Sequence, residues 1–129
     1  MDALTAPRPL VALACVALGG ALGASARYGA GLALRGDGAL PRHTLIVNVT
    51  GCFAFGLLGA ALGDRMSEEA RLLVFTGVLG GYTTFSAFSG ETFALLRTAP
   101  WTAASYVALS VGLGLLAVAA GERLGAALK

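Results

Sequence analysis

Residues 72–90 read LLVFTGVLGGYTTFSAFSG, a stretch of 19 residues without a single charged side chain. A helix needs about 20 apolar residues to cross the hydrocarbon core of a bilayer, because it rises only about 1.5 Å per residue. Three other uncharged stretches have a similar length, and they cover residues 10–26, 44–63 and 98–121. The sequence therefore predicts an all-α membrane protein with four transmembrane helices.

These stretches occupy most of the chain, so we expect a single four-helix transmembrane domain over residues 1–129, with spans at about 10–34, 44–63, 70–96 and 100–121. The composition agrees, since 57% of the residues are hydrophobic and 12% are charged. A competing interpretation makes Arg8, the first apolar run and Ala24-Ser25-Ala26 a cleavable signal peptide. It is disfavoured because the run exceeds the roughly 7 to 15 residues usual for a signal core.

Glycines and hydroxyl side chains crowd the third stretch between Gly77 and Ser89. Glycine costs about 1 kcal/mol relative to alanine inside a helix, and freed backbone groups at membrane depth are tolerated only inside protein or along a cavity. We therefore expect a break in the third helix near Gly80 to Thr83, with backbone groups turned toward an ion. The alternative is a continuous helix whose threonines bond back to the preceding turn.

Polar residues recur at helical spacing on the second and fourth spans. Thr44 and Asn48 lie one turn apart on one face, and an unpaired carboxamide in hydrocarbon costs several kcal/mol. Asn48 therefore needs water, an ion or another partner, and an interhelical bond to a hydroxyl is the plainer alternative. On the fourth span, Tyr106, Ser110 and Gly114 follow Thr102 at intervals of four residues. We expect this stripe to form the opposite wall of a polar passage.

Phe85 and Phe88 are three residues apart and share a helix face. Two phenylalanines at this spacing usually just pack, but here Ser86 and other hydroxyl residues surround them. An aromatic ring has a positive edge, so rings turned edge-on to a narrow passage favour an anion without trapping it. Arg27 and Glu91 are the ionisable residues that approach the spans, and we expect both at a mouth of such a passage, in its vestibule.

The sequence contains 19 glycines, and many of them stand four residues from another small residue. Lipid gives helices no hydrophobic reason to associate, so close approach of their backbones at small residues must hold them together. The pairs that fit this pattern are Gly19/Gly23, Gly20/Ala24, Gly59/Gly63 and Gly77/Gly81. They predict a tight bundle.

Basic residues are almost evenly divided between the two sides of the membrane. One side would hold Arg8, Arg65, Arg71, Arg123 and Lys129, and the other Arg35, Arg42 and Arg97. Because the asymmetry of lysine and arginine fixes orientation, such a weak bias predicts insertion both ways up. Four spans are few to enclose a pathway, and inverted pairs are a common architecture in transporters. We therefore expect an antiparallel, dual-topology homodimer in contact with membrane lipid.

Three ordered segments resemble the CrcB/Fluc family of bacterial fluoride channels. They are GGALGASARY at residues 19–28, TLIVNVTGCF at 44–53 and GGYTTFSAF at 80–88. The fourth span agrees with the family in length and position only. The resemblance implies a passive fluoride-selective channel that lowers cytoplasmic fluoride, built as a dual-topology homodimer in the cell inner membrane, with no enzymatic activity and no nucleic acid partner.

The resemblance also implies roles for individual residues. Asn48 would donate its amide to fluoride, Phe85 and Phe88 would present their ring edges along the pore, and Thr44 and Ser86 would flank it. Tyr106 and Ser110 would form a polar track, while Arg27 and Glu91 would lie in the vestibule. The backbone carbonyls of Gly80 and Thr83 would hold a structural sodium ion at the dimer centre.

Two residues depart from the family pattern. His43 stands where the family often has glycine before Thr-Leu, and Ala87 replaces the threonine usual between the two phenylalanines. Two other functions fit a chain of this kind. A small dual-topology multidrug exporter would want a membrane-embedded carboxylate, which the first helix lacks. A purely structural subunit would explain the glycines but not Asn48 among hydroxyl residues.

Overall fold

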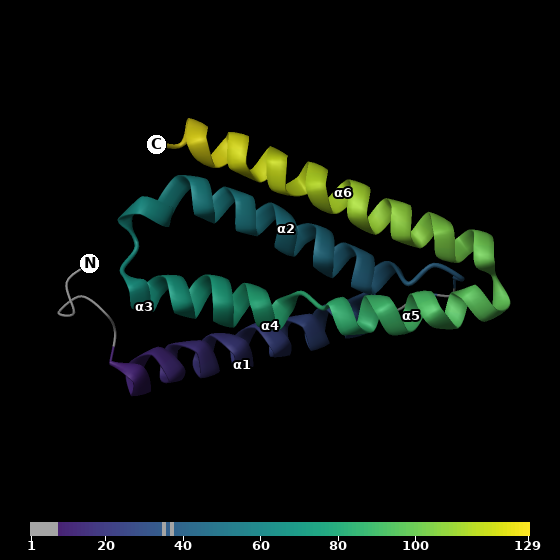
Figure 1. The fold of residues 1–129 in the computed structure, drawn as a ribbon, viewed down its shortest axis with the longest axis horizontal. Helices are drawn as coiled ribbons and strands as arrows, with labels where there is room; N and C mark the ends of the chain where they lie inside the picture. The colour runs from purple at the N-terminus through teal and green to yellow at the C-terminus, as the bar shows by residue number, and fades with distance from the viewer. Residues whose placement is uncertain (1–7, 35, 37) are drawn as a thin grey trace.

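A computed structural model describes residues 8–34, 36 and 38–129, and every regular element in them is helical (Figure 1). The first span is α1 (Pro9–Ala33), the second is α2 (Arg42–Leu62), and the fourth is α6 (Pro100–Ala127). A 3-10 turn, η1 (Gly63–Arg65), follows α2. Arg35, which enters the charge argument, lies outside the described residues.

The third span consists of four consecutive elements. They are α3 (Glu68–Arg71), the π-helix η2 (Leu72–Leu79), α4 (Gly80–Tyr82) and α5 (Phe85–Thr98). Counting them as one, the described residues form four helices that are long and apolar enough to cross a membrane: Pro9–Ala33, Arg42–Arg65, Glu68–Thr98 and Pro100–Ala127. The predicted all-α class with four membrane-spanning helices is confirmed.

Local signals set several helix ends. Ser67 precedes α3, and its hydroxyl accepts a hydrogen bond from the Ala70 amide at 3.2 Å, as an N-cap residue does. Pro100 is the first residue of α6, where its missing amide proton costs least. The fourth helix runs on to Ala127, six residues beyond the predicted end at 121.

Between α4 and α5 the backbone leaves the helical region. Thr83 has φ −78° and ψ 157°, and Thr84 has φ −149° and ψ 118°, so both residues are extended. Gly80, by contrast, is helical. Thr84 then caps α5, since its hydroxyl accepts from the Ala87 amide at 3.2 Å. The chain therefore advances by two extended residues before the second half of the span begins.

The helices associate mainly as two pairs. In Figure 1, α6 runs along α2, and α1 runs along α3, η2 and α4. The two pairs meet less extensively, chiefly where α5 packs on α6. The start of α1 and the end of α6 lie at the same end of the bundle, as an even number of spans requires.

Glycines set the closeness of each pair. A Cβ at Gly23 would overlap the Val78 carbonyl, and one at Gly77 would overlap the backbone of Gly19. On the other pair, a Cβ at Gly56 would overlap the Val118 carbonyl and one at Gly121 the Phe53 carbonyl. These positions permit direct backbone contact, which is how small residues join helices in lipid.

The predicted glycine pairs are therefore only partly those that the bundle uses. Gly19/Gly23 and Gly77/Gly81 lie at the contact of α1 with the third span. At Gly59 and Gly63, however, only side chains come near, 3.8 to 4.0 Å from an added Cβ. The expected close approach of backbones is therefore not found at Gly59 and Gly63 among the described residues, whereas Gly56, Gly121 and Gly125 provide it between α2 and α6.

Candidate functional site

Asn48 on α2 pairs with the extended backbone between α4 and α5. Its Nδ2 donates to the Thr84 carbonyl at 3.1 Å, and the Thr84 amide donates to its Oδ1 at 2.8 Å. One side chain thus holds both backbone groups of the residue at which the helical ladder is interrupted. The carboxamide has two N–H donors, so its second N–H remains for another partner.

This pairing releases backbone carbonyls. In an α-helix each carbonyl accepts from the amide four residues later. The amide that would serve Gly80 belongs to Thr84 and donates to Asn48, while the amide that would serve Thr83 belongs to Ala87 and donates to the Thr84 hydroxyl. The carbonyls of Gly80 and Thr83 therefore lose their helical donors at the interruption, and so do those of Gly81 and Tyr82, to which the amides of Phe85 and Ser86 make no bond.

Arg27 covers the neighbouring carbonyl. Its Nε donates to the Gly81 carbonyl at 3.1 Å, which ties α1 to the end of α4. The guanidinium thus approaches the interruption from the α1 side and supplies the Gly81 carbonyl with a donor. Arg27 and Glu91, both predicted for the vestibule, have different partners in this structure.

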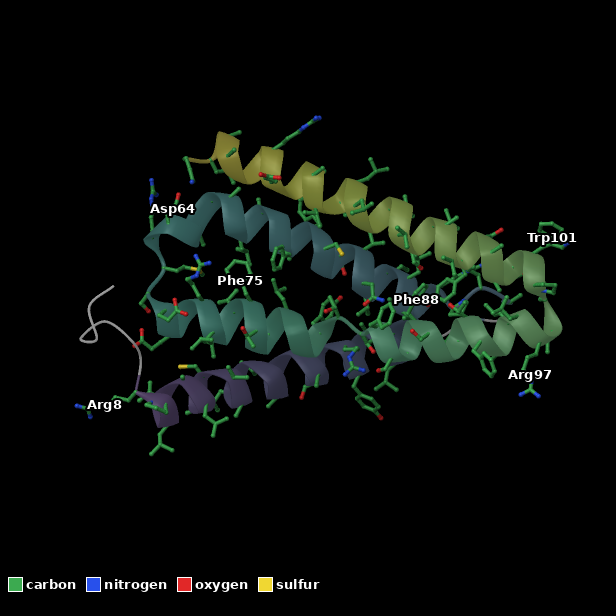
Figure 2. All side chains as sticks on the ribbon, viewed as in Figure 1. Arg8, Asp64, Phe75, Phe88, Arg97 and Trp101 are labelled. Carbon is green, nitrogen blue, oxygen red and sulfur yellow. The ribbon has the colours of Figure 1, made fainter. Side chains whose placement is uncertain are left out.

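A hollow of about 470 Å³ lies between α2 and the third span, beside Asn48. Its lining is largely apolar, with the polar groups of Asn48, Thr83 and Thr84 at one part of the wall. The lining residues are Asn48, Gly51, Cys52, Phe55, Phe75, Leu79, Gly80, Thr83, Thr84, Phe85 and Val118. Phe75 points into this space between the ribbons (Figure 2). We call Asn48, Gly80, Thr83, Thr84 and Phe85 the Asn48 cluster.

A second group of predicted residues gathers around a carboxylate. The Thr44 hydroxyl donates to Glu91 Oε1 and the Tyr106 hydroxyl donates to Glu91 Oε2, both at 2.7 Å. Tyr106 is fully buried and Thr44 is buried too. His43 Nε2 lies 3.4 Å from Glu91 Oε1. We call His43, Thr44, Phe88, Glu91 and Tyr106 the Glu91 cluster.

The two phenylalanines link these clusters. The ring centroids of Phe85 and Phe88 are 5.8 Å apart, and those of Phe88 and Tyr106 are 5.2 Å apart. Figure 2 shows Phe88 at the level where α5 approaches α6. Phe85 is 79% exposed in the single chain. The aromatic series therefore runs from a buried tyrosine to a ring that the chain itself leaves uncovered.

The remaining predicted residues take separate positions. Ser86 lies beside the Asn48 cluster, with its hydroxyl 3.3 Å from the Thr84 hydroxyl. Ser110 on α6 has a buried hydroxyl that finds no partner within the part of the chain that the structure describes. The same part contains no group of three or more His, Cys, Asp or Glu side chains able to hold a metal.

Two contributions were missed by reasoning from sequence. The role of Thr84 as the backbone partner of Asn48 depends on how α2 and the third span lie together, although its position as an N-cap is a local signal. His43 was noted only as a departure from a pattern. Its place next to Thr44 was the available hint, but only the fold brings it to Glu91.

The fold and these clusters define a multi-pass membrane protein with polar residues gathered inside a small helical bundle. The family model described as "CrcB-like protein, Camphor Resistance (CrcB)" matches residues 14–122. The chain therefore belongs to the CrcB family.

Relatives cover nearly the whole chain. A protein of Paracoccus denitrificans is 50% identical over 112 residues, which cover 85% of this chain and 90% of the relative. One of Chloroflexus aurantiacus is 47% identical, with 85% and 91% covered, and one of Thermus thermophilus is 49% identical, with 88% and 92% covered. Each of the three is named fluoride-specific ion channel FluC.

Proposed function

We propose that this protein is a fluoride-selective ion channel that exports fluoride passively and lowers its cytoplasmic level. The names of its relatives support this function, and family membership favours a channel over the multidrug exporter and over an enzyme. Hydrogen fluoride enters a cell as a neutral acid and dissociates inside, so a passive path for the anion is enough to lower its level. The observation that carries the proposal is Asn48 beside Phe85 at an interrupted helix.

Neutral groups suit this ion. Fluoride holds its water tightly, so a path must offer several donors and still release the ion. In our proposal the second N–H of Asn48 donates to fluoride, and the edges of Phe85 and Phe88 face it. Thr44, Ser86, Tyr106 and Ser110 supply hydroxyls along the path. Those of Thr44 and Tyr106 donate to Glu91, while that of Ser110 has no partner among the described residues. Arg27 and Glu91 stand in the vestibule.

The functional unit is an antiparallel, dual-topology homodimer. Phe85, 79% exposed, needs a second wall if it is to line a pore. Basic residues lie at both ends of the bundle, with Arg8 at one and Arg97 near Trp101 at the other (Figure 2). This distribution agrees with the weak charge bias that permits both orientations. The protein would reside in the cell inner membrane.

A structural sodium ion is part of this proposal. Free carbonyls at interrupted membrane helices are typical ligands for sodium, and Gly80 and Thr83 are among the residues whose carbonyls lose their helical donors. The donor set therefore fits a hard cation that prefers oxygen. Bound there, sodium would neutralise the two carbonyl dipoles and help to fix the interruption at the dimer centre.

Fluoride efflux from liposomes tests the function. Vesicles containing the purified protein are loaded with fluoride, a potassium ionophore balances the charge, and an electrode records release. We expect rapid efflux that needs no proton gradient. Asn48→Asp should reduce it to the rate of protein-free vesicles, because a negative charge would replace the donor that faces the anion. Phe85→Ile should do the same by removing the positive ring edge.

A matched control is Phe93→Ile on α5. Phe93 is 65% exposed and lies outside both clusters, so this variant should keep the wild-type rate. Well-folded wild-type dimers that release no fluoride would overturn the proposed function. Efflux that occurs only when a proton gradient is imposed would instead favour the exporter.

A further inference from the structure

His43 is the one histidine of the sequence, and it lies in the first turn of α2. Its Nε2 is 3.1 Å from the Thr44 hydroxyl and 3.4 Å from Glu91 Oε1. A hydroxyl has a single proton to donate, and Thr44 donates it to Glu91 at 2.7 Å. The contact with Thr44 therefore requires Nε2 to carry a hydrogen and to act as the donor.

Glu91 receives donors at both carboxylate oxygens. Thr44 donates to Oε1, where His43 also points, and Tyr106 donates to Oε2. A carboxylate surrounded by donors is used in its acceptor-only, ionised form. Glu91 thus brings a negative charge to the same cluster as two of the proposed pore hydroxyls, with the Phe88 ring 5.2 Å from that of Tyr106.

His43 and Glu91 differ in their access to solvent. The His43 side chain is 48% exposed and that of Glu91 is 24% exposed. The imidazole can therefore exchange protons with the aqueous phase at the end of α2. Two titratable groups lie on the side of the bundle that faces the imidazole: Glu91 on α5, and Tyr106 on α6, which reaches it through its hydrogen bond to the Glu91 carboxylate. Arg42 is the preceding residue, and together with His43 it lines a hollow at the connection of α1 to α2.

We propose that His43 is a proton-responsive residue that sets the charge of the Glu91 cluster, so that protonation of His43 speeds the passage of anions. This inference rests on the proposed fluoride conduction. Both protonation states can donate from Nε2, so the local geometry persists. Only the charge changes: imidazolium offsets the carboxylate, while neutral imidazole leaves a negative charge that repels an incoming anion.

The pH profile of fluoride efflux tests this inference. The full-length protein in liposomes is assayed at equal internal and external pH, from about pH 8 to about pH 5.5, the interval in which imidazoles usually titrate. We expect the rate to rise about fivefold as the pH falls, the scale of one unit charge at a partly exposed site. Protein-free vesicles at each pH measure the leak of hydrogen fluoride through lipid, which is subtracted.

Two variants separate a charge effect from a structural one. His43→Gln keeps a side-chain donor without a titrating group, so its rate should stay at the wild-type pH 8 level throughout. Glu91→Gln removes the negative charge that His43 offsets, so its rate at pH 8 should already exceed that of the wild type. A matched control, Glu68→Gln on the exposed first turn of α3, should keep the wild-type profile.

The outcomes are distinct. A flat wild-type profile with active efflux, or a His43→Gln variant that keeps the fivefold rise, overturns the role of His43 and leaves the channel intact. A wild type that releases no fluoride at any pH overturns the proposed function, and this inference with it. Loss of the rise in His43→Gln alone, with dimers of normal stability, supports the inference even where Glu91→Gln does not fold.

Discussion

The contact between α1 and the third span differs in kind from the junction between that span and α2. At the first, glycines bring backbones together, and an added Cβ at Gly23 or Gly77 would overlap backbone atoms. At the second, a hollow of about 470 Å³ remains, and the contacts beside it include the hydrogen-bonded pair of Asn48 and Thr84. Close backbone packing, supplemented by the hydrogen bond from Arg27 to the Gly81 carbonyl, therefore stabilises the first contact, while the loosely packed junction exposes the groups that can meet an ion.

The largest effect should come from the glycine contact. Gly23→Ala should lower the free energy of unfolding by about 3 kcal/mol, the upper end for overpacking, because the Val78 carbonyl in its way cannot rotate aside. Thermal unfolding in detergent measures this. Gly20→Ala on the same helix is the control, since nothing lies within 4 Å of its added Cβ. Equal melting temperatures for the two variants would contradict the comparison.

At the junction, Asn48→Ala should cost about 2 kcal/mol, because it leaves the amide and carbonyl of Thr84 unpaired. It should also stop fluoride efflux. Asn48→Gln, which keeps both amide groups but displaces them by one methylene, should recover part of the stability. An alanine variant as stable as the wild type would show that the junction does not depend on this pair.

A smaller effect is expected from the cap of α5. Thr84→Val removes the hydroxyl that accepts from the Ala87 amide, and loss of an N-cap costs about 1 kcal/mol. Thr84→Ser keeps the hydroxyl and should melt close to the wild type. If valine and serine melt alike, the cap contributes nothing to the interruption.

The smallest effect on stability should come from Ser110→Ala. The Ser110 hydroxyl is buried without a partner among the described residues, so its removal should change stability by less than about 0.5 kcal/mol. If fluoride uses this hydroxyl, efflux should nevertheless fall by severalfold. A variant with unchanged efflux would remove Ser110 from the pathway and would sharpen the difference between groups for packing and groups for transport.

Sequence reasoning reached the elements of the fold and the identities of most residues in both clusters. The spans follow from stretches such as residues 72–90, and the cap at Ser67 follows from its own neighbours. The glycine contacts were harder to predict. Gly59/Gly63 and Gly77/Gly81 have the same spacing, yet only the second pair meets a backbone. Spacing fixes a helix face but does not say which helix covers it.

By itself the sequence determined the number, length and class of the helices and the family of the chain, because partition between water and hydrocarbon acts on each segment separately. Only the tertiary structure decided that Asn48 meets the backbone of Thr84 and that His43 meets Glu91. These pairs are 36 and 48 positions apart in the chain. Their contact depends on how packed helices are rotated about their axes, which no local pattern specifies.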